Sequence, residues 1–197
     1  MQDSKDWTWV LDRTCDECGY EAGALGRDEL GPRLRALGGA WREMFGRGQI
    51  VVETPIDDRR SWTILEYGCH VRDVLDLFEE RIRLMLKKKR KAPTFKDWNQ
   101  EDAAVAGDYA SADPAKVAYA LASQAGKVAD VVDRVHGDAW EKPGLRSDGA
   151  AFTVESIVRY LIHDVEHHLW DARQIIDDAR RAAEEAAEAE AAVEVDG

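Results

Sequence analysis

Apolar residues recur at spacings of three and four along four segments of this 197-residue chain. In the first segment, the repeating positions are Leu30, Leu34, Leu37, Trp41 and Phe45. This spacing places the side chains on one face of an α-helix, although the Gly38-Gly39 pair lowers the helix propensity. We therefore expect a helix over residues 28–46.

The second segment follows Ser61, a residue type that suits a helix N-cap, and ends at the basic run KKKRK, residues 87–91. Its apolar positions are Ile64, Tyr67, Val71, Val74, Phe78, Ile82 and Met85. The pattern predicts a helix over residues 62–90. The basic run fits the end of this helix, where the helix dipole favours cations, and we interpret it as a solvated terminus.

Two further helices are expected over residues 114–135 and 153–180. Pro114 suits the first position of the earlier one, whose apolar residues are Val117, Leu121, Val128, Val131, Val132 and Val135. The apolar residues of the later one are Val154, Val158, Leu161, Val165, Leu169, Ala172 and Ile176. The sequence of residues 92–111 indicates a loop that allows one short helix, and strand patterns are almost absent.

These stripes predict an all-α protein, a four-helix bundle over residues 28–180, because each helix must bury one face against the others. Residues 1–27 show no sustained period and are expected to form an irregular arm that contains cysteine and tryptophan. Residues 181–197 form a tail of alanine and glutamate. This tail favours helix but has few large apolar groups to bury, so we expect a fraying helical extension or a disordered end.

Charge and hydropathy exclude several classes of function. The formal net charge is -12, of which residues 182–197 contribute -6, so the chain is not expected to bind nucleic acid. There is no run of eighteen apolar residues and no signal-peptide pattern at the amino terminus, so we expect a cytoplasmic location without membrane contact. Phosphate-binding loops, Rossmann glycine patterns and nucleophile elbows are not found in the sequence.

The stretch YLIHDVEHHLWDARQI, residues 160–175, concentrates candidate metal ligands in the last predicted helix. With about 100° per residue, His168 lies roughly 50° and Asp164 roughly 90° from the centre of the apolar stripe. By the same rule His163 and His167 lie roughly 150° to 170° away and are expected to face water. The spacing of Asp164 and His168, i and i+4, stacks them on one flank of the buried face.

His70 on the second helix falls roughly 80° from the centre of its own stripe, so it should face a neighbouring helix. Together with Asp164 and His168 it can supply three protein ligands and leave further positions for water or substrate. A semi-buried histidine that binds no metal is the alternative interpretation of His70.

The stretches SWTILEYGCHVRDVL, FKDWNQEDAA and HDVEHHLWDARQI resemble the DinB-like family over most of residues 28–177. The resemblance implies a four-helix bundle that holds a divalent metal, such as zinc, nickel or iron, through one histidine of the second helix and a His-x-x-x-His pair of the fourth. It also implies a small-molecule substrate. A homodimer is expected because related bundles often dimerise and the tryptophan-rich loops offer apolar surface.

In the related mycothiol-dependent maleylpyruvate isomerases, an acid replaces the first histidine of that pair, and an aspartate follows three residues after the second. His168 with Asp171 fits this pattern and places Asp164 where the acid belongs. The letters His-x-x-x-His select His163 and His167 instead. The helical angle favours Asp164 and His168, and we predict that His70, Asp164 and His168 bind the metal. A low-molecular-weight thiol is implied by this resemblance alone.

The sequence TCDECGY contains two of the three cysteines, Cys15 and Cys18. Three interpretations remain open: two free thiols that anchor the arm, one zinc knuckle, or a dithiol redox pair. A zinc site would need two more ligands, which Cys69 or the histidine-rich last helix can supply only if the arm folds over the bundle.

Two functions are compatible with these features. The first is a divalent-metal-dependent enzyme, a hydrolase, isomerase or transferase that acts on a small molecule with or without a thiol. The second is a bundle that binds a metal or ligand without catalysis, for example in a stress response. Fold alone does not separate them.

Overall fold

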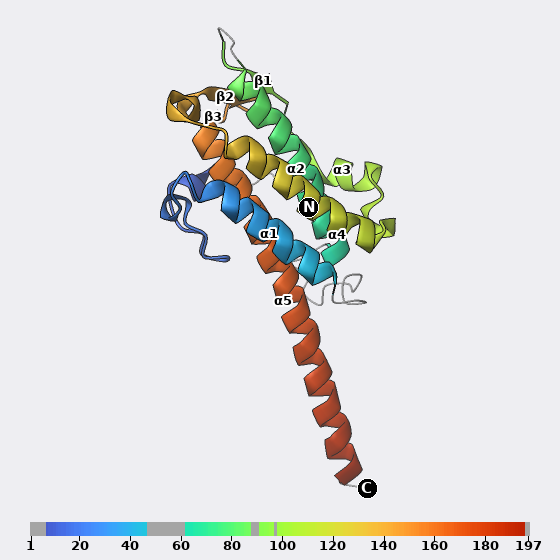
Figure 1. Cartoon of the computed structure of the whole chain (residues 1–197). Coiled ribbons are helices and arrows are strands. Elements are labelled where there is room, and N and C mark those ends of the chain that lie inside the picture. Colours follow the sequence, from blue (N-terminus) through green and yellow to red (C-terminus); the bar gives the residue numbers. More distant parts are fainter. Residues whose placement is uncertain (1–6, 47–61, 88–90, 97, 196–197) are drawn as a thin grey trace.

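The structure is a computed structural model that describes residues 7–46, 62–87, 91–96 and 98–195 (Figure 1). Four long helices form the body: α1 (Leu30–Phe45), α2 (Ile64–Leu86), α4 (Pro114–Val132) and α5 (Val154–Val195). A short helix, α3 (Gln100–Ala106), precedes α4, as the sequence allowed. The predicted all-α four-helix bundle is therefore confirmed.

The four long helices form a closed ring in which α1 packs on α4, α4 on α2, α2 on α5, and α5 on α1. The consecutive helices α1 and α2 therefore lie diagonally opposite each other across the core. The apolar stripes predicted from the sequence are buried along all four helices. Trp41 shows how closely the helices pack, because its indole nitrogen donates a hydrogen bond of 3.2 Å to the Val165 carbonyl of α5.

The start of α2 differs from the expectation. Thr63 is the N-cap, and its side chain forms a reciprocal capping box with Glu66, in which the Glu66 amide donates to the Thr63 hydroxyl at 3.2 Å. Ser61, the predicted cap, lies outside the described residues. The helix ends at Leu86, before the basic run, and residues 88–90 also lie outside the described part of the chain.

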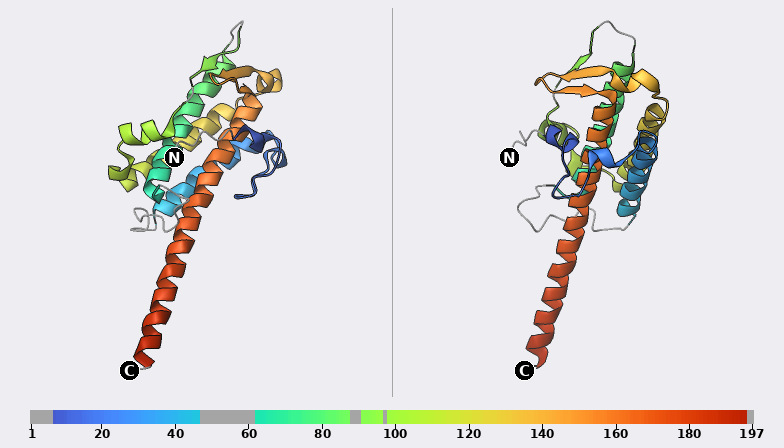
Figure 2. Two further views of the ribbon diagram at one scale, coloured as in Figure 1. Left: turned by 180° about the vertical axis from the view of Figure 1, so that it is seen from behind. Right: turned by 90° about the vertical axis from the view of Figure 1, so that its left-hand side faces the viewer.

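The structure extends the last helix to Val195, so the acidic tail continues α5 and projects beyond the bundle (Figure 2). Its side chains are exposed from Arg181 to Ala192. Alanine and glutamate have high helix propensity, and no glycine or proline interrupts this stretch. The tail is thus helical for local reasons, without packing against the core.

A small sheet was not expected from the sequence. It consists of β1 (Thr94–Phe95), β2 (Pro143–Arg146) and β3 (Ala151–Thr153), with β1 parallel and β3 antiparallel to β2. These strands of two to four residues are too short to show an alternating pattern. The sheet leads directly into α5, where the Ser156 amide donates to the Thr153 hydroxyl at 3.1 Å.

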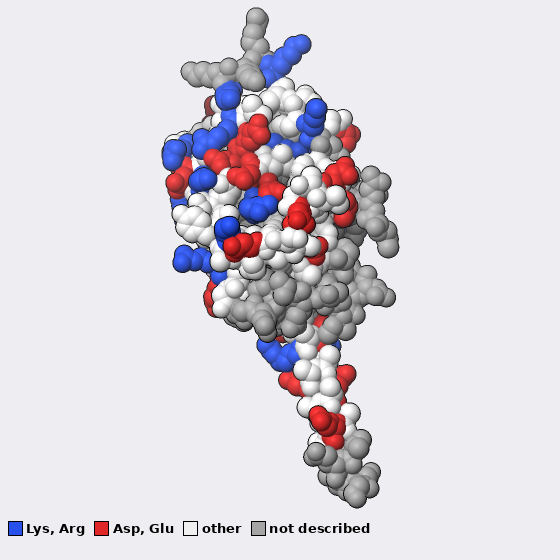
Figure 3. Space-filling model, turned by 90° about the vertical axis from the view of Figure 1, so that its right-hand side faces the viewer, with Lys and Arg blue, Asp and Glu red and all other residues white. Residues whose placement is uncertain are grey.

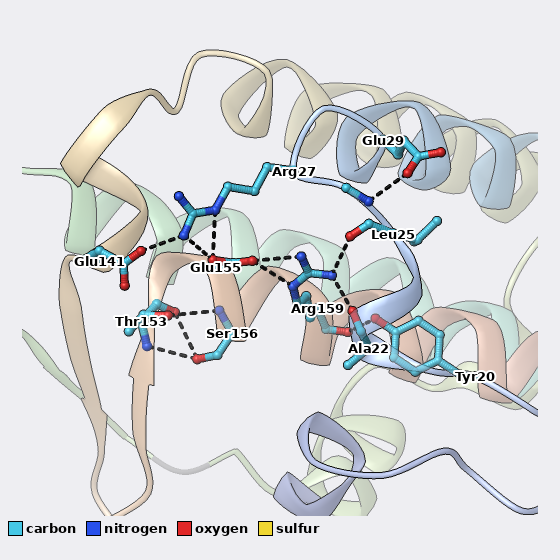
Figure 4. Close-up of polar contacts among 11 residues, drawn as sticks. Tyr20, Ala22, Leu25, Arg27, Glu29, Glu141, Thr153, Glu155, Ser156 and Arg159 are labelled. Atoms are coloured by element: carbon cyan, nitrogen blue, oxygen red, sulfur yellow. Dashed lines mark hydrogen bonds and ion pairs between the residues drawn. The ribbon is translucent and has the colours of Figure 1, made fainter.

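The amino-terminal arm, residues 7–29, folds against α5 through two 3-10 turns, Thr8–Leu11 and Ala22–Ala24 (Figure 4). Arg159 of α5 donates hydrogen bonds to the carbonyls of Ala22 and Leu25, the latter at 3.0 Å. The Tyr20 hydroxyl donates to the Arg159 carbonyl at 2.8 Å. The arm is therefore an ordered layer on the bundle.

The described helices include none that is long and apolar enough to span a membrane. On the face drawn in Figure 3, acidic and basic side chains are interspersed, and acidic groups continue along the projecting part of α5.

The two adjacent glycines of α1 have opposite surroundings, and we predict opposite effects of alanine. A Cβ at Gly38 would lie 2.5 Å from the Ala125 side chain and 3.4 Å from the Ala122 Cα of α4. Gly39 is exposed, with no atom within 4 Å of such a Cβ. We expect Gly38→Ala to lower the free energy of unfolding by about 1–3 kcal/mol and Gly39→Ala to raise it by about 0.5–1 kcal/mol. Urea unfolding measures both, and equal effects would contradict the close α1–α4 contact.

Removing the Arg159 guanidinium should loosen the arm. We expect Arg159→Met to lower the free energy of unfolding by about 1–3 kcal/mol, because the carbonyls of Ala22 and Leu25 and the carboxylate of Glu155 lose their charged hydrogen-bond donor. Trypsin should also cleave faster after Arg13 in the arm. The matched control is Arg35→Met, which removes a surface pair with Asp130 and Asp133 and should cost less than about 1 kcal/mol. If the two variants show equal cleavage at Arg13, Arg159 does not anchor the arm.

Candidate metal centres

Helix α5 carries two pairs of potential metal ligands, each at the i, i+4 spacing. The two pairs are offset from each other by one residue along the helix. The pair Asp164 and His168 lies toward α2, whereas the pair His163 and His167 lies beneath the arm. Since one residue turns a helix by about 100°, the two pairs face different neighbours within the same two turns. Each pair meets partners from another part of the chain.

The first cluster, the α2–α5 site, consists of His70, Asp164 and His168, as predicted. One potential ligand atom of each residue lies within 4.8 Å of those of the others. His70 Nε2 is 3.7 Å from Asp164 Oδ2, and His168 Nε2 is 3.9 Å from Asp164 Oδ1. Two imidazole nitrogens thus lie near one carboxylate, at separations longer than a hydrogen bond.

Three buried polar atoms of the α2–α5 site lack hydrogen-bond partners in the described part of the chain. Both ring nitrogens of His70 and Oδ2 of Asp164 are buried without one among the described residues, and His70 is only 1% exposed. Buried polar atoms in this condition cost about 1–3 kcal/mol each unless something satisfies them. Imidazole nitrogens and a carboxylate oxygen are ligands of zinc and of other divalent transition metals, so the residues present fit such an ion.

The protonation states in this cluster also suit a cation. Burial raises the pKa of Asp164, but the neighbouring His70 and His168 outweigh this effect and lower it to about 2. Burial lowers the pKa of His70, because the charged imidazole is disfavoured away from water. An ionised carboxylate and a neutral imidazole are the forms that bind metals.

Asp171 and a group of aromatic rings orient these ligands. His168 Nδ1 lies 3.2 Å from Asp171 Oδ2, which leaves Nε2 on the side of Asp164. A carboxylate in this place fixes the tautomer of an imidazole that binds a metal through its other nitrogen. Around the site, Trp62 and Trp98 pack on His70 at centroid distances of 5.1 and 5.3 Å, and Tyr67 packs on His168 at 5.2 Å.

The prediction that His163 and His167 face water is wrong. They are 3% and 7% exposed and lie beneath the arm. Their potential ligand atoms form a second group, the arm–α5 site, with the sulfurs of Cys15 and Cys18, again within 4.8 Å of one another. The angular rule located these histidines correctly relative to the bundle core. It failed because the arm covers the opposite face of α5.

The three cysteines are free thiols in different surroundings. Burial raises the pKa of Cys18 to about 12 and that of Cys69 to about 11. Cys69 lies 4.0 Å from the Tyr109 carbonyl and belongs to neither cluster. It is therefore not the residue that complements the CxxC pair.

A separate open cleft lies between α1 and α5. Its lining includes Met44, Arg173 and Ile176 and shares no residue with either cluster. It offers no histidine or cysteine, so the candidate chemistry lies at the two ligand clusters.

Comparison with known proteins agrees with this architecture. YfiT from Bacillus subtilis, described as a probable metal-dependent hydrolase with an unusual four-helix bundle topology, superposes with a TM-score of 0.71 at 16% sequence identity. The match covers 82% of this chain and 91% of YfiT, and it shows a shared fold. No curated protein matches the sequence. A family model of the DinB superfamily matches residues 12–172, and the chain therefore belongs to the DinB superfamily.

Proposed function

We propose that this protein is a divalent-metal-dependent hydrolase of small molecules, with His70, Asp164 and His168 as the metal ligands. The observation that carries the proposal is the buried His70 imidazole, whose two nitrogens have no hydrogen-bond partner among the residues that the structure describes and which lies beside the ionised Asp164. The description of YfiT as a probable metal-dependent hydrolase supports the same class of function. Three protein ligands leave positions for water and substrate, as in catalytic sites.

The residues around the cluster have distinct tasks in such an enzyme. A divalent cation held there would supply Lewis acidity and lower the pKa of a water or thiol ligand. Asp164 provides the negative charge, and Asp171 holds the His168 ring so that Nε2 stays on the side of Asp164. Trp62, Trp98 and Tyr67 restrict the rotation of the two imidazoles and exclude water from their flanks.

A thiol-dependent transferase or isomerase is the second candidate. It is favoured by Asp164 in the acid position and by the contact of His168 with Asp171, the pattern of the mycothiol-dependent isomerases. In that case a low-molecular-weight thiol would take the place of water at the metal.

The homodimer expected from the resemblance remains a prediction. Light scattering of the protein at tens of micromolar tests it.

The metal assignment predicts a selective loss of binding. His70→Ala and His168→Ala should each reduce the bound metal by one equivalent per chain, because two remaining protein ligands hold a divalent ion weakly. Elemental analysis of the purified full chain measures this loss. The matched control is His136→Ala, which removes an exposed histidine and should leave the metal content unchanged. Retention of the full metal content in both site variants would refute the assignment.

Activity separates the candidate functions. Wild-type protein loaded with zinc, nickel or iron should hydrolyse members of a panel of small esters and amides. His70→Ala should lower the hydrolysis rate at least about 100-fold, which is a typical cost of removing a positioned catalytic group. Activity that appears only when a low-molecular-weight thiol is added would identify the thiol-dependent candidate. Metal binding without turnover under either condition would favour a non-catalytic binding protein.

A further inference from the structure

We propose that Cys15, Cys18, His163 and His167 form a second metal site, a structural zinc site that fastens the amino-terminal arm to α5. The two cysteines come from the arm and the two histidines from α5, 145 or more residues further along the chain. One potential ligand atom of each residue lies within 4.8 Å of the other three. This site is distinct from the α2–α5 site and does not depend on the function proposed for it.

The ligand set selects zinc. Two thiolates and two imidazoles with no fifth protein group form the closed tetrahedral set of structural zinc sites. In such a site, sulfur and nitrogen ligands at about 2.3 and 2.0 Å from the ion stand about 3.5 Å apart. Cys15 Sγ and His167 Nδ1 are 3.7 Å apart. The spacing of this pair therefore already fits a common zinc ion.

Both histidines are placed as ligands, for separate reasons. His163 is 97% buried, and its Nε2 has no hydrogen-bond partner among the described residues. His167 turns Nδ1 toward Cys15, while its Nε2 lies 3.3 Å from Glu17 Oε2 and 3.8 Å from Asp171 Oδ2. A metal-bound histidine commonly directs its other ring nitrogen to a carboxylate, as His167 does here.

The backbone of the arm folds as a cysteine knuckle requires. The Gly19 amide donates to the Cys15 carbonyl at 2.9 Å, and the Cys15 amide donates to the Tyr20 carbonyl at 2.8 Å. Gly19 has a φ of +75°, a conformation that glycine adopts readily and other residues adopt at a cost. This turn brings Cys15 and Cys18 together on the side of α5.

Aromatic rings from the arm cover the histidines. Trp7 packs on His163 and His167 at centroid distances of 5.7 and 5.1 Å, and Tyr20 packs on His163 at 5.4 Å. The cover shields the site and keeps both rings in position. Four protein ligands fill the tetrahedral positions of zinc, so the zinc acts on folding: it binds the folded arm and not the unfolded one.

Cobalt substitution tests the site in the unmodified full-length protein. Protein purified under reducing conditions, freed of metal with a chelator and loaded with Co²⁺ should bind two equivalents and show thiolate-to-cobalt charge transfer in the near ultraviolet. That absorption requires sulfur ligands, which the α2–α5 site does not have. With Zn²⁺ instead, two of the three thiols should resist alkylation, and a chelator should release them.

Variants connect the signal to the arm. Cys15→Ser/Cys18→Ser should lose the charge-transfer band and one of two zinc equivalents, and trypsin should cleave before residue 28 faster than in the wild type. Cys69→Ser is the matched control, since it removes a buried thiol outside both clusters and should keep the band. His70→Ala should also keep the band while it loses the other equivalent, so the failure of one site is distinguishable from that of the other.

Three results would overturn the zinc assignment. The first is the absence of the charge-transfer band from Co²⁺-loaded wild-type protein. The second is alkylation of Cys15 and Cys18 at the same rate with and without Zn²⁺. The third is a Cys15–Cys18 disulfide found by mass spectrometry in protein purified under reducing conditions. The last would identify a redox dithiol. The first two would leave two free thiols packed beneath the arm. None of them requires a variant to fold.

Discussion

The position of α5 among its neighbours determines most of what is distinctive in this protein. One helix presents a buried apolar stripe to the core, the pair Asp164 and His168 to α2, and the pair His163 and His167 to the arm. Because three faces of α5 each contact a different part of the protein, the helix cannot rotate without breaking contacts on all three. The 3.6-residue period thus ties the core packing to both ligand clusters, because a rotation of α5 by about 100° would move one pair to the place of the other and bury different residues in the core.

The amino-terminal arm covers the face of α5 that the other helices leave open. A four-helix bundle leaves each helix with one face toward solvent, and on α5 that face carries His163, His167 and Arg159. Residues 7–29 cover it with Tyr20, Trp7 and two cysteines, and Arg159 ties the arm down by hydrogen bonds to its carbonyls. The arm therefore belongs to the folded unit, although its sequence has no helical period. The match to the DinB superfamily, which begins at residue 12, also includes most of the arm.

The sequence was sufficient for the four long helices, which depend on local periodicity, and for the convergence of His70, Asp164 and His168, which the helical angles and the family resemblance together favoured. The stripes located the four long helices, and the angles of His70, Asp164 and His168 predicted that they would converge. The sheet was missed because its strands are too short to show a pattern. The burial of His163 and His167 was missed because it depends on contacts between residues more than 140 positions apart, for which no local pattern exists. The CDECGY turn was the available signal, and the fourth helix was recognised as a possible source of its missing ligands.

Asp171 connects the two clusters. Its Oδ2 atom lies 3.2 Å from His168 Nδ1 and 3.8 Å from His167 Nε2, so one carboxylate faces a ligand of each proposed site. Each imidazole that binds a metal through one nitrogen becomes a stronger donor at the other, and the carboxylate stabilises that proton in both cases. Two neighbouring cations would otherwise repel each other through the same turn of α5, and the Asp171 charge between their ligands offsets part of this repulsion. The structural ion proposed beneath the arm and the catalytic ion proposed between α2 and α5 are compatible for this reason.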